Sequence, residues 1–157
     1  MRKLFVAASA ALIAATLGLG SATLANPGGG GGGSGGSSAE ESAVPSMSDV
    51  NKLIKAERWR DAIDLLKLIV ADNPRSADAY NLLGYAYRNL GDFKRAGQFY
   101  GRALKIDPNH TGALEYQGIL FVKTGDLVSA RANLERIKGL CGTGCENYQD
   151  LAEAIGG

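Results

Sequence analysis

The chain has 157 residues, enough for one small domain, and its two cysteines and one histidine leave little material for a metal or thiol enzyme. Its net charge is +1, and without Arg2 and Lys3 the remaining 15 basic residues face 16 acidic ones. A near-neutral chain offers no electrostatic case for nucleic acid or an anionic membrane. We therefore predict no nucleic-acid partner.

The first 25 residues have the order of a secretory signal peptide. Arg2 and Lys3 precede an apolar run, residues 4–19, and small residues follow through Ala25. This order of basic, apolar and small segments is typical of export signals. We expect cleavage after Ala25, with Ala22 as the second choice. The alternative is an uncleaved membrane anchor, since about 20 apolar residues can span a bilayer.

Residues 26–46 are predicted to be a disordered Gly/Ser-rich linker. Residues 27–38 are almost wholly glycine and serine, which offer no packing surface and lose the most entropy on ordering. A phosphate-binding loop needs glycines between a strand and a helix, followed by a lysine. That context is absent from the sequence around this tract, so we interpret it as a tether or a flexible N-terminus.

A period of 34 residues runs through the rest of the chain, as in the series Ala62, Ala96 and Ala130. Residues 77–108 match the tetratricopeptide (TPR) pattern at its aromatic, Leu-Gly, alanine and proline positions. The matching residues are Tyr80, Leu83, Gly84, Tyr87, Ala96, Tyr100 and Pro108. Because the neighbouring sequence repeats this pattern in phase, the chain resembles the TPR family across residues 43–142.

The resemblance implies an all-α fold: a right-handed α-solenoid of three TPR helix-turn-helix units plus a C-terminal capping helix. Residues 47–157 would form this domain, with repeats at about 43–76, 77–110 and 111–142 and the capping helix at about 145–155. We expect helices at 48–56, 59–71, 77–89, 93–106 and 146–155. The Gly91-Asp92 turn would end one helix and cap the next. Gly84 would allow two helices to approach closely, and Trp59 would cover the open end of the stack.

Cys141-Gly142 stands where the repeat pattern leads us to expect Asp-Pro, and Cys145 follows shortly after. In an exported protein, two cysteines this close most often form a structural disulfide, which would fix the capping helix. Two other hypotheses compete. The sequence from Thr143 to Glu146 fits a capping box, which would place Cys145 in the first turn of the last helix as a reactive thiolate. His110 could join the two cysteines in a copper or zinc site.

The concave surface lined by the first helix of each repeat is where TPR proteins hold peptides, according to the resemblance. Tyr85 is the best candidate anchor, and the alternative is that it packs against the next repeat. Tyr85 and Ile119 stand where clamps for a C-terminal carboxylate place asparagine, so that ligand is not predicted. The predicted partner-binding residues are Asn51, Lys55, Asn81, Tyr85, Arg88, Glu115 and Lys123.

We predict a non-enzymatic protein-binding or scaffold module in the periplasm of a Gram-negative bacterium. Outside the Gly/Ser-rich tract the sequence contains no HExxH or Gly-x-Ser-x-Gly motif and no histidine with a nearby serine and acid, and we predict no catalytic residue, metal or cofactor. The partner, an unknown protein or peptide, and the oligomeric state cannot be deduced from sequence. The alternative function is a thiol-redox or copper/zinc-handling factor that uses Cys141 and Cys145.

If residues 1–25 are a cleaved signal, the exported protein should begin at Asn26. Amino-terminal sequencing of the protein recovered from the periplasmic fraction checks this. A mature protein that still begins at Met1 would contradict cleavage and favour the membrane anchor.

Overall fold

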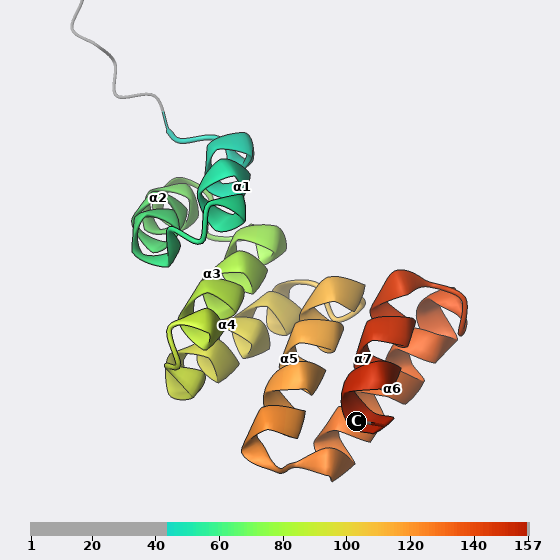
Figure 1. Ribbon diagram of the computed structural model, residues 1–157. Helices are drawn as coiled ribbons and strands as arrows, with labels where there is room; N and C mark the ends of the chain where they lie inside the picture. The colour runs from blue at the N-terminus through green and yellow to red at the C-terminus, as the bar shows by residue number, and fades with distance from the viewer. Residues whose placement is uncertain (1–43, 157) are drawn as a thin grey trace, which may run out of the picture. The chain divides into compact units, whose positions relative to one another are not determined.

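The computed structural model describes residues 44–156, which form seven α-helices and no strand. The predicted signal peptide and residues 26–43 of the predicted linker lie outside the described residues. Figure 1 shows the helices following one another as antiparallel pairs. The helices are α1 (Met47–Lys55), α2 (Trp59–Asp72), α3 (Ala77–Asn89), α4 (Phe93–Ile106), α5 (Thr111–Thr124), α6 (Leu127–Cys141) and α7 (Glu146–Gly156).

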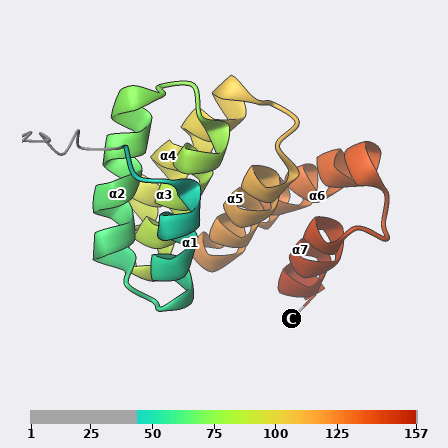
Figure 2. The ribbon, with the colours of Figure 1, turned by 90° about the horizontal axis from the view of Figure 1, so that it is seen from above.

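The predicted all-α solenoid fold is confirmed. The first helices of the pairs, α1, α3 and α5, form with α7 a set that we call the A helices, and α2, α4 and α6 are the B helices. Contacts join α1 to α2, α3 to α4 and α5 to α6 within the pairs. Further contacts join α2 to α3, α4 to α5, α3 to α5, and α7 to both α5 and α6. Figure 2 shows α2, α4 and α6 on one side of the A helices.

Local sequence sets the helix boundaries. The side chains of Ser46, Ser76, Asp92 and Asp126 each accept a hydrogen bond from the backbone N–H three residues on, which caps the helix that follows. The predicted bounds of α3 and α4 match exactly, and those of α1, α2 and α7 agree within one residue.

The turn inside each pair places one residue in the left-handed region. Gly91 and Gly125 have φ of 79° and 84°, and Glu57 occupies the same repeat position with φ of 53°. Glycine adopts this conformation without steric cost, whereas a residue with a Cβ does so at a cost of about 1 kcal/mol or more. The first repeat therefore keeps the turn geometry without the glycine that favours it.

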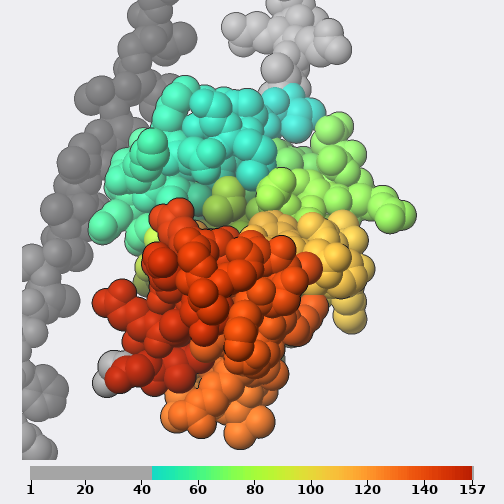
Figure 3. All heavy atoms as spheres, turned by 90° about the vertical axis from the view of Figure 1, so that its right-hand side faces the viewer, coloured from blue at the N-terminus to red at the C-terminus, as the bar shows by residue number. Residues whose placement is uncertain are grey.

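One main core runs through the first two pairs and into α5. Its buried side chains include Val50, Leu66, Leu83, Tyr100 and Ala113. A smaller core, formed by Leu114, Ile137 and Leu151, joins α5, α6 and α7. Figure 3 shows the atoms of α6 and α7 covering the C-terminal end of the stack. The predicted capping helix thus has its own apolar contacts with the last pair.

Gly84 permits the closest helix approach in the central pair. A methyl group at residue 84 would lie 2.5 Å from two ring carbons of Tyr100, which is fully buried. Gly118, one repeat later, is equally close to Leu151 of α7, at 2.5 Å. The predicted role of Gly84 is confirmed, and α7 uses the equivalent glycine to dock on α5.

Trp59 lies differently from the prediction. Its indole is half-buried and meets the ring of Tyr85 edge-on, with 5.7 Å between the ring centroids. The indole therefore packs between the first and second pairs, where it makes a favourable edge-to-face aromatic contact.

Replacing Gly84 with alanine should destabilise the protein by about 1–3 kcal/mol, because the added methyl group overlaps the Tyr100 ring. Gly101→Ala in α4 is the matched control, since nothing lies within 4 Å of a methyl group there. Helix propensity should make this control more stable by up to about 1 kcal/mol. Urea unfolding followed by circular dichroism measures the stability of both variants. Equal unfolding midpoints for the two variants would contradict the close approach of the helices.

Candidate partner-binding face

The A helices carry the residues that the sequence predicts to bind a partner. On α1, Asn51 and Lys55 are exposed, as is Lys123 at the end of α5. Asn81 and Glu115 are buried, with 6% and 4% of their surface accessible, and Tyr85 and Arg88 are half-buried. The structure therefore brings only Tyr85, Arg88, Asn81 and Glu115 into its packed part, and the binding role of all seven stays a prediction.

Tyr85 lies at the centre of a series of aromatic contacts across the A helices. Its ring meets Trp59 of α2 on one side and Tyr116 of α5 on the other, with 4.9 Å between the two tyrosine centroids. Tyr116 in turn lies beside the buried ring of Tyr100, at 6.3 Å. Tyr85 thus packs against neighbouring repeats, as one of the two hypotheses expected, and its half-exposed ring also remains part of the surface.

Arg88 lies over two tyrosine rings at once. Its guanidinium carbon is 5.1 Å from the centroid of Tyr85 and 5.2 Å from that of Tyr116. One guanidinium nitrogen, Nη1, also donates a long hydrogen bond, 3.4 Å, to the carbonyl oxygen of Tyr116. Cation–π attraction and this bond together fix the position of the charge. Sequence reasoning did not find Tyr116, whose spacing from Tyr85 is not that of the repeat.

Glu115 links α5 to α7. Asn147 Nδ2 donates a 2.6 Å hydrogen bond to Glu115 Oε2. Burial raises the pKa of Glu115 above its ordinary value of 4.5, and the bond from Asn147 and the charge of Arg88 oppose this rise. Glu115 therefore acts as a buried acceptor for the last helix and is not freely available to a partner.

Two buried polar atoms near this surface have no hydrogen-bond partner in the described part of the chain, Asn81 Oδ1 and the hydroxyl of Tyr100. Burial raises the pKa of the Tyr100 hydroxyl well above its ordinary range, and the charge of Arg88 lowers it. Buried polar groups are almost always paired, so these two atoms need an explanation. Both atoms are closed off from the surface, so a partner that rests on the A helices does not reach them.

His110 has a structural role that the sequence did not indicate. It caps α5, because its Nδ1 accepts a hydrogen bond from the backbone N–H of Ala113 at 3.3 Å. Its Nε2 therefore carries the proton and donates to Asp78 Oδ1 at 3.1 Å. The imidazole is only 15% exposed, so it joins the second repeat to the third.

The cysteines lie together at the end of α6. Cys141 and Cys145 are paired, with their sulfur atoms 2.07 Å apart and their Cα atoms 6.0 Å apart. The predicted capping box is wrong in one respect: α7 begins at Glu146, so Cys145 precedes the first turn of the helix. Among residues 44–156, no group of three or more His, Cys, Asp or Glu side chains could hold a metal ion. The hypothetical site of His110 and the two cysteines is thus not assembled.

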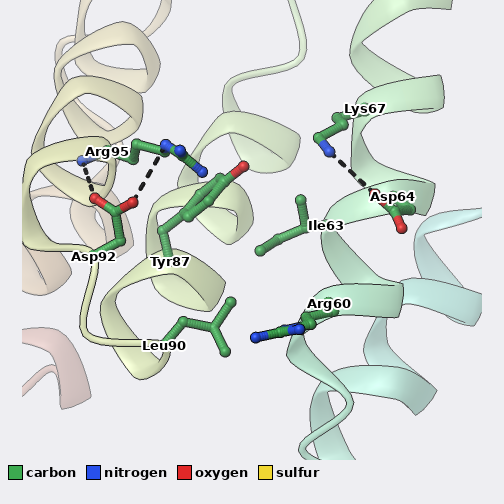
Figure 4. Close-up of a pocket in the computed structure, with 8 residues that line it drawn as sticks. All are labelled: Arg60, Ile63, Asp64, Lys67, Tyr87, Leu90, Asp92 and Arg95. Carbon is green, nitrogen blue, oxygen red and sulfur yellow. Dashed lines mark hydrogen bonds and ion pairs between the residues drawn. The ribbon is translucent and has the colours of Figure 1, made fainter. Parts of the chain in front are cut away.

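A separate hollow of about 420 Å³ lies where α2 meets the turn between α3 and α4 (Figure 4). Its charged side chains are mostly paired with one another, Lys67 with Asp64 at 3.0 Å and Arg95 with Asp92 at 3.2 Å. Such paired charges offer a ligand little that water does not already provide. We therefore place the candidate site on the A helices instead.

The comparisons with known proteins agree with this architecture. Residues 77–110, which contain α3 and α4, match the family model described as tetratricopeptide repeat. The predicted resemblance to the tetratricopeptide repeat family is confirmed for this central repeat. No helix among residues 44–156 has the length and apolar character needed to cross a membrane.

The chain is similar to three proteins of known name. It is 30% identical over 96 residues to a probable biofilm formation methyltransferase, WspC, from Pseudomonas putida, a match that covers 61% of this chain and 23% of the relative. The first TPR domain of Spaghetti (RPAP3), bound to an HSP90 peptide, has a TM-score of 0.61 at 20% identity, covering 70% of this chain and 90% of that one.

The third is PcrH in complex with the chaperone-binding region of PopD, with a TM-score of 0.59 at 20% identity, covering 70% of this chain and 82% of that one. The two structural likenesses establish the fold alone. The chain spans less than a quarter of the length of the curated relative WspC. The shared part is therefore a segment of 96 residues within a much longer protein.

The raised pKa of Glu115 predicts a pH-dependent cost to folding. A carboxyl whose pKa is higher in the folded than in the unfolded state keeps its proton more tightly in the folded protein. The free energy of unfolding therefore falls as the pH rises from the unfolded pKa through the folded pKa. Glu115→Gln removes the charge and keeps an oxygen for Asn147, so it should stabilise the protein at pH 7. The gain should disappear as the pH falls below the ordinary pKa of 4.5.

Thermal unfolding of both proteins between pH 4 and pH 7 measures this difference. Glu153→Gln is the matched control, because Glu153 is exposed on α7. A Glu115→Gln variant that is less stable than the parent at pH 7 would contradict the burial cost.

Proposed function

We propose that the protein is a non-enzymatic interaction module that binds a peptide or an extended segment of a protein partner along the A helices. The observation that carries the proposal is the series of ring contacts from Trp59 through Tyr85 to Tyr116, which leaves partly exposed aromatic side chains beside one another on this face. The apolar side chains of an extended peptide can pack on such rings.

The rigidity of this aromatic surface also supports the proposal. Tyr85 and Tyr116 keep part of their rings exposed while their packing holds them rigid. Rigid tyrosines provide contact area at a low cost in conformational entropy, which is why they dominate many interfaces. The two similar structures were determined with a bound HSP90 peptide and a region of PopD, so the same fold holds peptides elsewhere.

We further propose that the protein works in the periplasm, with Cys141 and Cys145 as a structural disulfide. The signal-like residues 1–25 support export, and a disulfide persists in that oxidising compartment. The short loop between the cysteines gives the bond a local role, holding the start of α7 beside the end of α6. The alternative of a thiol-redox or metal-handling factor receives no specific support from the contacts of residues 44–156.

The proposal predicts that Tyr85→Ala weakens peptide binding about tenfold or more, since truncation removes a rigid aromatic contact at the centre of the surface. Peptides selected from a random phage-displayed library on the mature protein serve as probes, and fluorescence anisotropy measures their affinity. Tyr85→Phe should bind nearly as the parent does, because it keeps the ring.

Leu68→Ala is the matched control, because Leu68 is 55% exposed on the B helix α2. It should leave affinity unchanged, and circular dichroism should show that all variants keep their helicity. Equal affinity of the parent and the Tyr85→Ala variant would contradict the proposed position of the site.

A further inference from the structure

Arg88 differs from every other basic residue that the structure describes. All other lysines and arginines of residues 44–156 are exposed, whereas Arg88 is half-buried. Five of the exposed ones, Lys52, Arg58, Lys67, Arg95 and Lys138, have an acidic partner three residues away in the sequence. Arg88 has no carboxylate at ion-pair distance among the described residues.

A partly desolvated cation without a counter-ion destabilises the protein. The planar guanidinium of arginine can offset this by donating two parallel hydrogen bonds to a carboxylate. The nearest candidate within the chain, Glu115, does not fill this role. Its carboxylate accepts from Asn147 of α7, and the burial that raises its pKa further disfavours its charged form. The two tyrosine rings stabilise the cation, but they leave its remaining N–H donors without acceptors.

The geometry also holds the guanidinium ready for a ligand. Its carbon and the centroids of Tyr85 and Tyr116 form a nearly equilateral triangle, with sides of 5.1, 5.2 and 4.9 Å. The two helices α3 and α5 thus fix the charge from both sides. A preorganised donor of this kind loses little entropy when it binds a carboxylate.

We propose that Arg88 binds the side-chain carboxylate of an aspartate or glutamate within the bound peptide. The inference rests on the proposed peptide-binding function and adds the chemistry of the partner: an acidic residue that pairs with Arg88, next to an apolar side chain that contacts Tyr85. Charge complementarity favours this occupant over a basic or neutral segment.

The selected peptides test the inference. A selection on the parent protein should yield sequences that share an aspartate or glutamate, and a selection on the Arg88→Gln variant should lose it. For one selected peptide, changing its acidic residue to the amide should weaken binding to the parent about tenfold or more, the usual effect of losing a charge-assisted hydrogen bond. The same change should have little effect on binding to Arg88→Gln.

Arg102→Gln is the matched control, because Arg102 also lies over a tyrosine ring, Tyr80, at 4.6 Å, but belongs to the B helix α4. It should bind the peptide as the parent does. Arg88→Lys should keep part of the preference for acid, since it retains the charge without the planar donor pair. This intermediate result would not follow from a purely structural role of Arg88.

The outcomes separate the two proposals. Enriched peptides without a shared acidic residue, or an undiminished preference for acid in Arg88→Gln, would overturn the role of Arg88 and leave peptide binding intact. A selection on the parent that enriches no peptide would contradict the proposed function, and the inference would fall with it. Should Arg88→Gln not fold, the acid-to-amide change in the peptide alone decides, and unchanged affinity for the parent overturns the inference.

Discussion

The contact between Gly84 and Tyr100 determines the arrangement of the central repeat and of the surface above it. Because residue 84 has no side chain, the Tyr100 ring occupies the space that a methyl group would fill. The buried ring of Tyr100 then supports Tyr116, which in turn contacts Tyr85 and lies below Arg88. A packing requirement between α3 and α4 thus determines where a cation lies on the candidate binding face.

The last helix shows how the repeat continues beyond the third pair. Tyr148 stands 34 residues after Leu114, as Leu114 stands after Tyr80, and Ala152 takes the position of Gly84 and Gly118. The helix α7 therefore follows the pattern of a first repeat helix, which explains its contacts with α5. Its Leu151 packs against Gly118 in the way that Tyr100 packs against Gly84. The cysteine pair connects this helix to α6 where the earlier repeats have Pro74 and Pro108.

Much of the fold could be predicted because the repeat signal is local. The caps, the left-handed turn glycine and the 3.6-residue apolar spacing identify α3 and α4 to the residue. The first repeat was harder to predict, since Glu57 replaces the turn glycine, and there the geometry is maintained by the packing of the flanking helices. The start of α7 at Glu146 was predicted correctly, but the capping box that begins at Thr143 was not, because the helix starts after Cys145.

The candidate site could be predicted only in part, because its contacts join residues that are not related by the repeat. Tyr116 lies 31 residues after Tyr85, and the cap at His110 reaches back 32 residues to Asp78. Spacing arguments identified Tyr85, Asn81 and Arg88 as surface positions of one helix. They could not show that Asn81 would be buried without a partner for its oxygen, because that depends on how closely α5 approaches α3.

The half-buried cation and the buried carboxyl of the A helices do not neutralise each other. Arg88 and Glu115 are the half-buried cation and the buried carboxyl of residues 44–156, yet they make no ion pair. In an ion pair, the attraction between the two charges would have offset the cost of removing each of them from water. No unpaired charge would then have remained at this surface. Instead Asn147 binds the carboxyl and two tyrosines hold the cation. The carboxyl is thereby committed to holding α7, and the cation is left available for a charge from outside the fold.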